Sequence, residues 1–100
     1  MKHEISGTDL VIIPDDPLAA ATVKSLHEQM AQYFTDPGKF QKLVVDLSGV
    51  KVVDSLGVNL LVGLYKECRK HGKTYQVTHC SPPIRRLFDL YKLTGYFGVE

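Results

Sequence analysis

The chain has 100 residues, of which 44% are apolar and 23% are charged, with a formal net charge of +1. This length and composition predict one folded domain over residues 1–100, and the scattered lysines and arginines exclude a nucleic-acid-binding stripe. Because the N-terminus lacks a signal-peptide pattern and no apolar run could cross a bilayer, we expect a cytoplasmic protein without membrane insertion.

The first predicted elements are two short strands, 3–6 and 9–13, joined by a turn at Gly7. They should form a hairpin at the edge of a sheet. A helix is predicted to start at Asp15-Asp16-Pro17, since a carboxylate can cap a helix and proline tolerates its first position. Thr35-Asp36-Pro37-Gly38 should end it. Its apolar positions recur every three or four residues, as expected for one buried stripe: Ala19, Val23, Leu26, Met30 and Tyr33.

The second half of the chain alternates strand and helix signals. An apolar run at 43–48 predicts a strand buried on both faces, and a more polar strand is expected at 74–78. Between them, the apolar period predicts a helix at about 56–70 with this buried stripe: Leu60, Leu61, Leu64, Tyr65 and Cys68. A third helix should open at Ser81-Pro82-Pro83, end at Leu93-Thr94-Gly95, and bury Ile84, Leu87, Phe88 and Tyr91. Tyr96 and Phe97 should then pack back onto the domain.

This order of elements predicts an α/β fold in the order β-β-α-β-α-β-α. Strands that alternate with helices through short turns form an open sheet with helices against it. We therefore expect a mixed four-stranded sheet covered by helices.

The change from strand period to helix period falls at Asp54-Ser55. A serine at this point can act as an N-cap, because its oxygen accepts hydrogen bonds from the free N–H groups of the first helical turn. The same N–H groups and the positive end of the helix dipole can also receive a phosphate. Local physics therefore allows Ser55 to be a cap or a phosphorylated residue.

A longer pattern surrounds this serine: V-V-D-L-S-G-V-K-V-V-D-S-L-G-V, a leucine-rich helix, an H-G-K turn, a strand, and S-P-P-I-R-R-L-F-D-L-Y-K-L-T-G. From about residue 43 to residue 97 the chain resembles the STAS domain of bacterial anti-sigma factor antagonists. In that family the serine of a D-S-x-G motif is phosphorylated by a serine kinase that is also the anti-sigma factor. Ser55 occupies the matching place, after Asp54 and before Gly57.

The resemblance implies a phosphorylation-switched regulatory binding protein rather than an enzyme. Unphosphorylated, it would bind the kinase or anti-sigma factor and so regulate transcription; phosphorylation of Ser55 would release it, and a PP2C-type phosphatase would reset it. The expected partner-binding surface is Asp54, Ser55, Leu56, Gly57, Val58 and Asn59. Gly57 would let another backbone, or a kinase active site, come close to the serine.

Two alternatives differ in function. A STAS-like chain could instead be a constitutive scaffold subunit of a transporter or signalling complex. A small serine hydrolase would need Ser55 beside a base, with His71 and His79 as candidates, but V-D-S-L-G lacks the G-x-S-x-G elbow.

No cofactor or metal is expected. Adjacent His79 and Cys80 in an extended segment point to opposite faces, which is poor geometry for joint metal binding with His71. Gly49, Gly57 and Gly63 match no nucleotide-binding motif, and Gly63 is interpreted as a point where the helix approaches a neighbour. Cys68 and Cys80 have no C-x-x-C spacing and are expected to be reduced thiols.

Overall fold

The structure is a computed structural model that describes residues 2–35 and 37–99. Its sheet has the strand order β1-β2-β3-β4, formed by β1 (Lys2–Ser6), β2 (Asp9–Ile13), β3 (Lys42–Asp46) and β4 (Thr74–Thr78). β1 pairs antiparallel with β2, whereas the other two pairings are parallel. The predicted mixed four-stranded α/β fold is confirmed.

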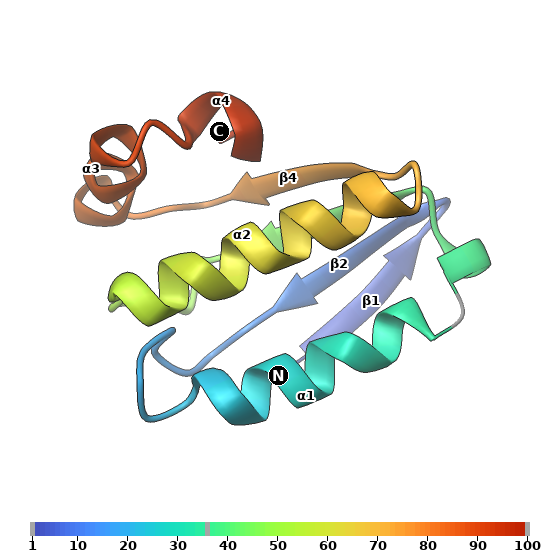
Figure 1. Cartoon of the computed structure of the whole chain (residues 1–100), viewed down its shortest axis with the longest axis horizontal. Coiled ribbons are helices and arrows are strands. Elements are labelled where there is room, and N and C mark those ends of the chain that lie inside the picture. Colours follow the sequence, from blue (N-terminus) through green and yellow to red (C-terminus); the bar gives the residue numbers. More distant parts are fainter. Residues whose placement is uncertain (1, 36, 100) are drawn as a thin grey trace.

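Two helices, α1 (Val23–Ala31) and α2 (Ser55–Lys70), lie side by side over one face of the sheet (Figure 1). The 3₁₀ turns η1 (Gln32–Phe34) and η2 (Pro37–Lys39) lead from α1 to β3. Beyond β4 lie α3 (Pro82–Leu90) and the short α4 (Thr94–Phe97), at the opposite edge of the sheet from β1 (Figure 1).

The core lies between the sheet and this helical layer. Because strand side chains alternate between faces, paired residues of neighbouring strands share one face. Leu10 pairs with Leu43, and Val45 pairs with both Ile12 and Val77. All five are buried and meet the buried residues of α2, which are spaced as predicted: Leu60, Leu61, Leu64 and Cys68. The helix period in the sequence therefore corresponds to a real buried face. The strand expected to be buried on both faces, β3, is fully buried on this face, whereas Val44 on its other face is half-buried.

The predicted start of the first helix is wrong by several residues. Leu18 does not enter a helix, because its backbone N–H donates to the Val52 carbonyl at 2.9 Å and its own carbonyl accepts from Asp54 N–H at 3.0 Å. These bonds form an isolated parallel bridge between Leu18 and Val53, and the Leu18 side chain is fully buried. The helix can start only after this bridge, so α1 begins at Val23.

The C-terminal helices also differ in part from the sequence expectation. Ile84 and Phe88 are buried on α3, but Tyr91 is 48% exposed because it follows the end of the helix at Leu90. Phe97 is fully buried and packs edge-on against Phe88, with ring centroids 5.2 Å apart. Its neighbour Tyr96 is 59% exposed. Although exposed, the Tyr96 ring meets Tyr65 of α2 edge-on, with ring centroids 5.7 Å apart. Both aromatic residues therefore pack back onto the domain, and Phe97 is the one that is buried.

Candidate functional site

The candidate site is built where β3 leads through a bridging loop into α2. Asp54 precedes the helix in an extended conformation, with φ −99° and ψ −174°. Its Oδ1 accepts hydrogen bonds from the backbone N–H of Leu56 at 2.9 Å and of Gly57 at 3.0 Å. This is the geometry of an N-cap. The cap is therefore Asp54, and the interpretation of Ser55 as the cap is wrong.

The second oxygen of Asp54 binds a distant part of the chain. Oδ2 accepts a hydrogen bond from the Ala20 backbone N–H at 3.0 Å, across 34 residues of sequence. Hydrogen bonds from Gly57 and Ala20 stabilise the charged carboxylate and lower the pKa of Asp54 below its ordinary value of 3.8. At neutral pH a fixed negative charge therefore stands directly before the serine.

Ser55 is the first residue of α2, and its side chain is exposed. Among residues 2–35 and 37–99, none forms a hydrogen bond with its hydroxyl group, since Asp54 already bonds the N–H groups that a capping serine would take. The hydroxyl is thus presented to solvent on a rigid element, where another protein could reach it.

Gly57 has a packing role that the sequence did not specify. A Cβ atom at this position would lie 1.9 Å from the Leu18 carbonyl oxygen and 2.9 Å from the Leu18 Cβ. Any side chain would therefore displace the Leu18 backbone, which is itself bonded to Val52 and Asp54. The backbone that lies close to Gly57 is therefore that of Leu18 in the same chain. This contact allows the loop before α1 to pack against the start of α2.

The six residues expected to form a partner-binding surface lie together at the start of α2, but with different exposure. Ser55 and Asn59 are exposed, and the large apolar side chain of Leu56 is 43% exposed. Asp54 is half-buried beneath its hydrogen bonds. Gly57 is buried against Leu18, and Val58 is 4% exposed because it belongs to the inner face of the helix. The outer surface is therefore formed by Ser55, Leu56 and Asn59.

Two of the N–H groups that a phosphate at the helix start was expected to use are already occupied. The N–H groups of Leu56 and Gly57 already donate to the Asp54 carboxylate. A phosphate on Ser55 would have to displace a group of the same charge to bind them. The geometry favours a phosphate that points outward beside Asp54.

A family model for the STAS domain matches residues 1–100. The chain belongs to the STAS domain family. Relatives of known structure share the fold at low identity. A candidate anti-sigma factor antagonist from Thermotoga maritima is 17% identical, has a TM-score of 0.89, and is matched over 98% of this chain and 83% of its own.

Two further structures similar to this STAS chain are a phosphorylated protein and a much longer transporter. The phosphorylated form of the Bacillus cell fate determinant SpoIIAA is 18% identical, with a TM-score of 0.75, over 99% of this chain and 87% of that protein. The murine anion transporter Slc26a9 is 19% identical, with a TM-score of 0.81, over 96% of this chain but only 16% of the transporter. At these identities the likeness shows the fold.

The other candidate residues of this STAS chain do not gather into one site. His71 Nε2 lies 3.6 Å from Glu67 Oε2, whereas His79 Nδ1 lies 3.4 Å from Asp46 Oδ1, so the two histidines have different carboxylate partners. Within the part of the chain that the structure describes, no three His, Cys, Asp or Glu residues are grouped as metal ligands. Cys68 and Cys80 are free thiols there, and no described helix is long and apolar enough to span a membrane.

No sequence pattern marks the residues that hold the site from the other side. Leu18 and Ala20 contact the start of α2 only through backbone groups, so their side-chain types carry no signal of this role. The one local clue is Gly57 in the first turn of a helix, where a glycine is unfavourable unless something packs closely against it.

Proposed function

We propose that this STAS chain is a phosphorylation-switched regulatory binding protein of the anti-sigma factor antagonist type. Unphosphorylated, the surface of Ser55, Leu56 and Asn59 binds a serine kinase that is also an anti-sigma factor. Phosphorylation of Ser55 releases that partner, and a PP2C-type phosphatase restores the binding form. The kinase and phosphatase are assigned through the family resemblance, and the chain contributes no catalytic group of its own.

The observation that carries this proposal is the free, exposed hydroxyl of Ser55 at the first position of α2. A serine that only capped the helix would have its oxygen occupied by backbone N–H groups. Here Asp54 performs that task, which leaves the hydroxyl available as a phosphate acceptor.

The charge at this point supplies the switch. A phosphoserine adds about −1.5 to −2 charge at neutral pH. That charge would stand beside the Asp54 carboxylate, which hydrogen bonds keep ionised. A partner surface that docks over Leu56 would then have to desolvate two adjacent anionic groups, and this opposes binding. Each loss of about 1.4 kcal/mol weakens affinity tenfold, so a modest penalty is enough to release a partner.

Phosphorylation by the cognate kinase tests the proposal directly. The protein is incubated with the kinase and ATP, and the modified residue is mapped by mass spectrometry. We expect one phosphate on Ser55. Ser55→Ala should bind the kinase as the unmodified protein does but accept no phosphate, and Ser55→Asp should bind at least tenfold more weakly. Ser48→Ala, which changes another exposed serine near the site, is the matched control and should behave as wild type. Phosphate at another residue, with Ser55 unmodified, would refute the assignment.

A second candidate function is a permanent STAS subunit of a transporter or signalling complex. It is favoured by the likeness to the STAS-like part of a transporter, which corresponds to nearly the whole of this chain. Co-purification separates the two functions. A stoichiometric complex that is equally stable with Ser55→Ala and Ser55→Asp supports the scaffold, whereas a complex lost with Ser55→Asp supports the switch.

A further inference from the structure

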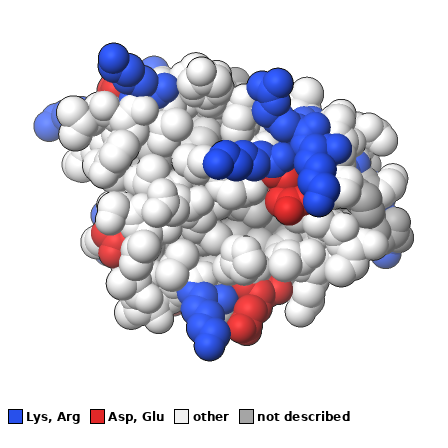
Figure 2. Space-filling view, viewed as in Figure 1, with Lys and Arg blue, Asp and Glu red and all other residues white. Residues whose placement is uncertain are grey.

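A groove runs along the seam between α1 and α2, on the outer side of the helical layer. It has a volume of about 690 Å³, and its floor is apolar, formed by Met30, Phe34, Leu60 and Leu64. The helices α1 and α2, which lie side by side in Figure 1, both contribute residues to its lining. The surface in Figure 2 is hollowed at this place.

This groove is continuous with the surface that carries Ser55. A second hollow of about 490 Å³ shares His27, Asn59 and Leu60 with the first and extends to Leu56 and Val23. Leu56 directly follows the serine and is 43% exposed. A partner bound at Ser55 could therefore reach the groove through the adjoining hollow.

Gly63 keeps the middle of the groove open. The expectation that it marks a close neighbour is wrong, because among the described residues no atom outside the local helix backbone lies within 4 Å of the place where its Cβ would be. A glycine inside a helix costs about 1 kcal/mol relative to alanine. No contact among the described residues explains why a glycine stands here. Gly63 lines the groove, so a molecule bound in the groove could approach the helix most closely at this residue.

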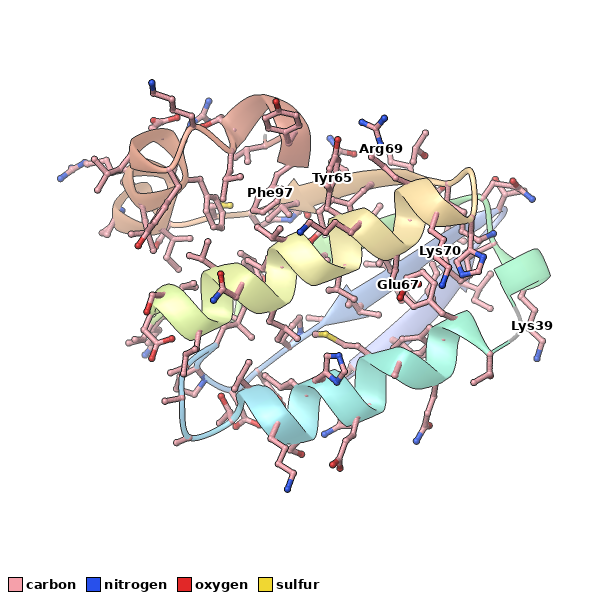
Figure 3. All side chains as sticks on the ribbon, viewed as in Figure 1. Lys39, Tyr65, Glu67, Arg69, Lys70 and Phe97 are labelled. Atoms are coloured by element: carbon pink, nitrogen blue, oxygen red, sulfur yellow. The ribbon has the colours of Figure 1, made fainter. Side chains whose placement is uncertain are left out.

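The rim of the groove on α2 carries two lysines and one glutamate, Lys66, Lys70 and Glu67, so lysines outnumber the acidic residue there. Lys66 and Lys70 line it one turn apart, and Lys and Arg side chains gather over this end of α2 (Figure 2). Neither lysine has an ion pair or side-chain hydrogen bond with any residue that the structure describes. The nearby Glu67 lies 3.6 Å from His71, so its charge faces a histidine. Lys70 points to the α1 side of the helix, whereas Arg69 points to the other side, where it bonds Tyr65 (Figure 3).

The shape and backbone of the groove indicate which kind of molecule would fit. Both walls are α-helices, whose backbone groups already bond internally, so an extended peptide would find no strand to pair with. A small ligand needs an enclosed pocket that buries most of its surface. The volume of this groove would suit such a ligand, but its lining on α2 runs from Asn59 to Lys70, about 18 Å at 1.5 Å per residue, which matches the length of a helix better. A helix satisfies its own backbone and can lay one apolar face along such a seam.

We propose that the α1–α2 groove binds an amphipathic helix of the regulatory partner, with acidic side chains that face Lys66 and Lys70. The inference rests on the proposed function, since it assigns the second contact of the partner that docks at Ser55. The apolar face of the helix packs on Leu60 and Leu64 and lies closest to the chain at Gly63. Contact at the groove supplies affinity, while contact at Ser55 supplies the switch.

A model helix tests the groove without the kinase. The probe is a synthetic 18-residue amphipathic helix with leucines on one face and glutamates beside them, and its counterpart has lysines in place of the glutamates. Binding to the full chain is followed by two-dimensional ¹H–¹⁵N NMR. We expect the acidic peptide to shift resonances of residues 27–34 and 59–71, and to bind at least tenfold tighter than the basic one. Equal affinities, shifts confined to other surfaces, or no binding at millimolar peptide would overturn the proposal.

Two variants and their controls locate the contact. Gly63→Leu should fill the groove and weaken the acidic peptide at least tenfold, whereas Gly95→Leu, a similarly open glycine in α4, should leave binding within twofold. Lys66→Glu combined with Lys70→Glu should abolish the preference for the acidic peptide. Arg85→Glu combined with Arg86→Glu makes the same change in net charge on the exposed side of α3 and should retain that preference. Thermal unfolding of each variant verifies that it is folded.

The kinase assay then separates this inference from the proposed function. With Gly63→Leu we expect the KM for phosphorylation of Ser55 to rise at least tenfold while kcat stays within twofold, because the reacting serine is unchanged. If Ser55 is phosphorylated and Gly63→Leu has the wild-type KM, the groove proposal fails and the switch stands. If Ser55 is not a substrate, the switch fails, and the peptide footprint still decides for or against the groove.

Discussion

The two glycines of α2 allow one substitution to be tested in two environments. Gly57→Ala and Gly63→Ala make the same chemical change in the same helix, yet we expect opposite effects on the free energy of unfolding. At Gly63 the added methyl group meets no atom of the described residues within 4 Å beyond its own stretch of helix backbone. At Gly57 it would lie 1.9 Å from the carbonyl oxygen of Leu18, well inside van der Waals contact.

The magnitudes follow from these contacts. Gly63→Ala should stabilise the fold by about 0.5–1 kcal/mol, which is the helix-propensity difference between the two residues. Gly57→Ala forces the Leu18 carbonyl away from α2 and so strains its hydrogen bond with the Asp54 N–H. Overpacking costs about 1–3 kcal/mol and a lost backbone hydrogen bond adds roughly 1 kcal/mol, while the helix-propensity gain offsets about 0.5–1 kcal/mol. We therefore expect a net destabilisation of about 1–3 kcal/mol.

Urea unfolding followed by far-UV circular dichroism measures both variants against wild type. The slope of the free energy with urea should stay the same, so that the midpoints report stability alone. The reasoning is refuted if Gly57→Ala is as stable as wild type, or if the two variants shift in the same direction by similar amounts.

Three further predictions concern single side chains. Hydrogen bonds lower the pKa of Asp54, so its carboxylate stabilises the fold above pH 3.8, and this contribution is lost as the pH falls through the folded-state pKa. The difference in the free energy of unfolding between wild type and Asp54→Asn, measured by urea unfolding at a series of pH values, should therefore become smaller below pH 3.8. A difference that stays constant with pH would contradict this. Burial raises the pKa of the Cys68 thiol to about 12 and also raises the pKa of Cys80, which is less buried. At pH 8 a thiol-reactive reagent should modify Cys80 slowly and Cys68 only after unfolding, and peptide mapping would show which residue is modified. Modification of Cys68 before unfolding would be inconsistent with its packing. No described histidine hydrogen-bonds to Ser55, so a fluorophosphonate probe should not label this serine. An active serine hydrolase in the same assay is the positive control and should react. Labelling of Ser55 would support the hydrolase alternative.

Several features of the fold could be predicted because their signals are local. The buried stripe of α2 repeats every three or four residues, and the strands around it carry branched apolar side chains, so the order of elements was evident without tertiary information. The serine was singled out in the same way, since the period changes at Asp54-Ser55 and the surrounding motif is short and contiguous.

The errors occurred where distant segments meet. The start of α1 was misplaced because Leu18 bridges to Val53, which is far along the chain, and no pattern around Asp15-Asp16-Pro17 reports that pairing. The empty surroundings of Gly63 were equally invisible, since they depend on the separation of α1 and α2.

The order of strands and helices, and a serine at the start of α2, follow from the amino-acid sequence alone, because periodicity and motif are properties of neighbouring residues. Only the tertiary structure decided that Asp54 caps the helix and so leaves the Ser55 hydroxyl free. One oxygen of that carboxylate bonds the start of α2 and the other bonds Ala20, which is 34 residues away. A hydrogen bond across that distance exists only once the sheet has brought both segments together.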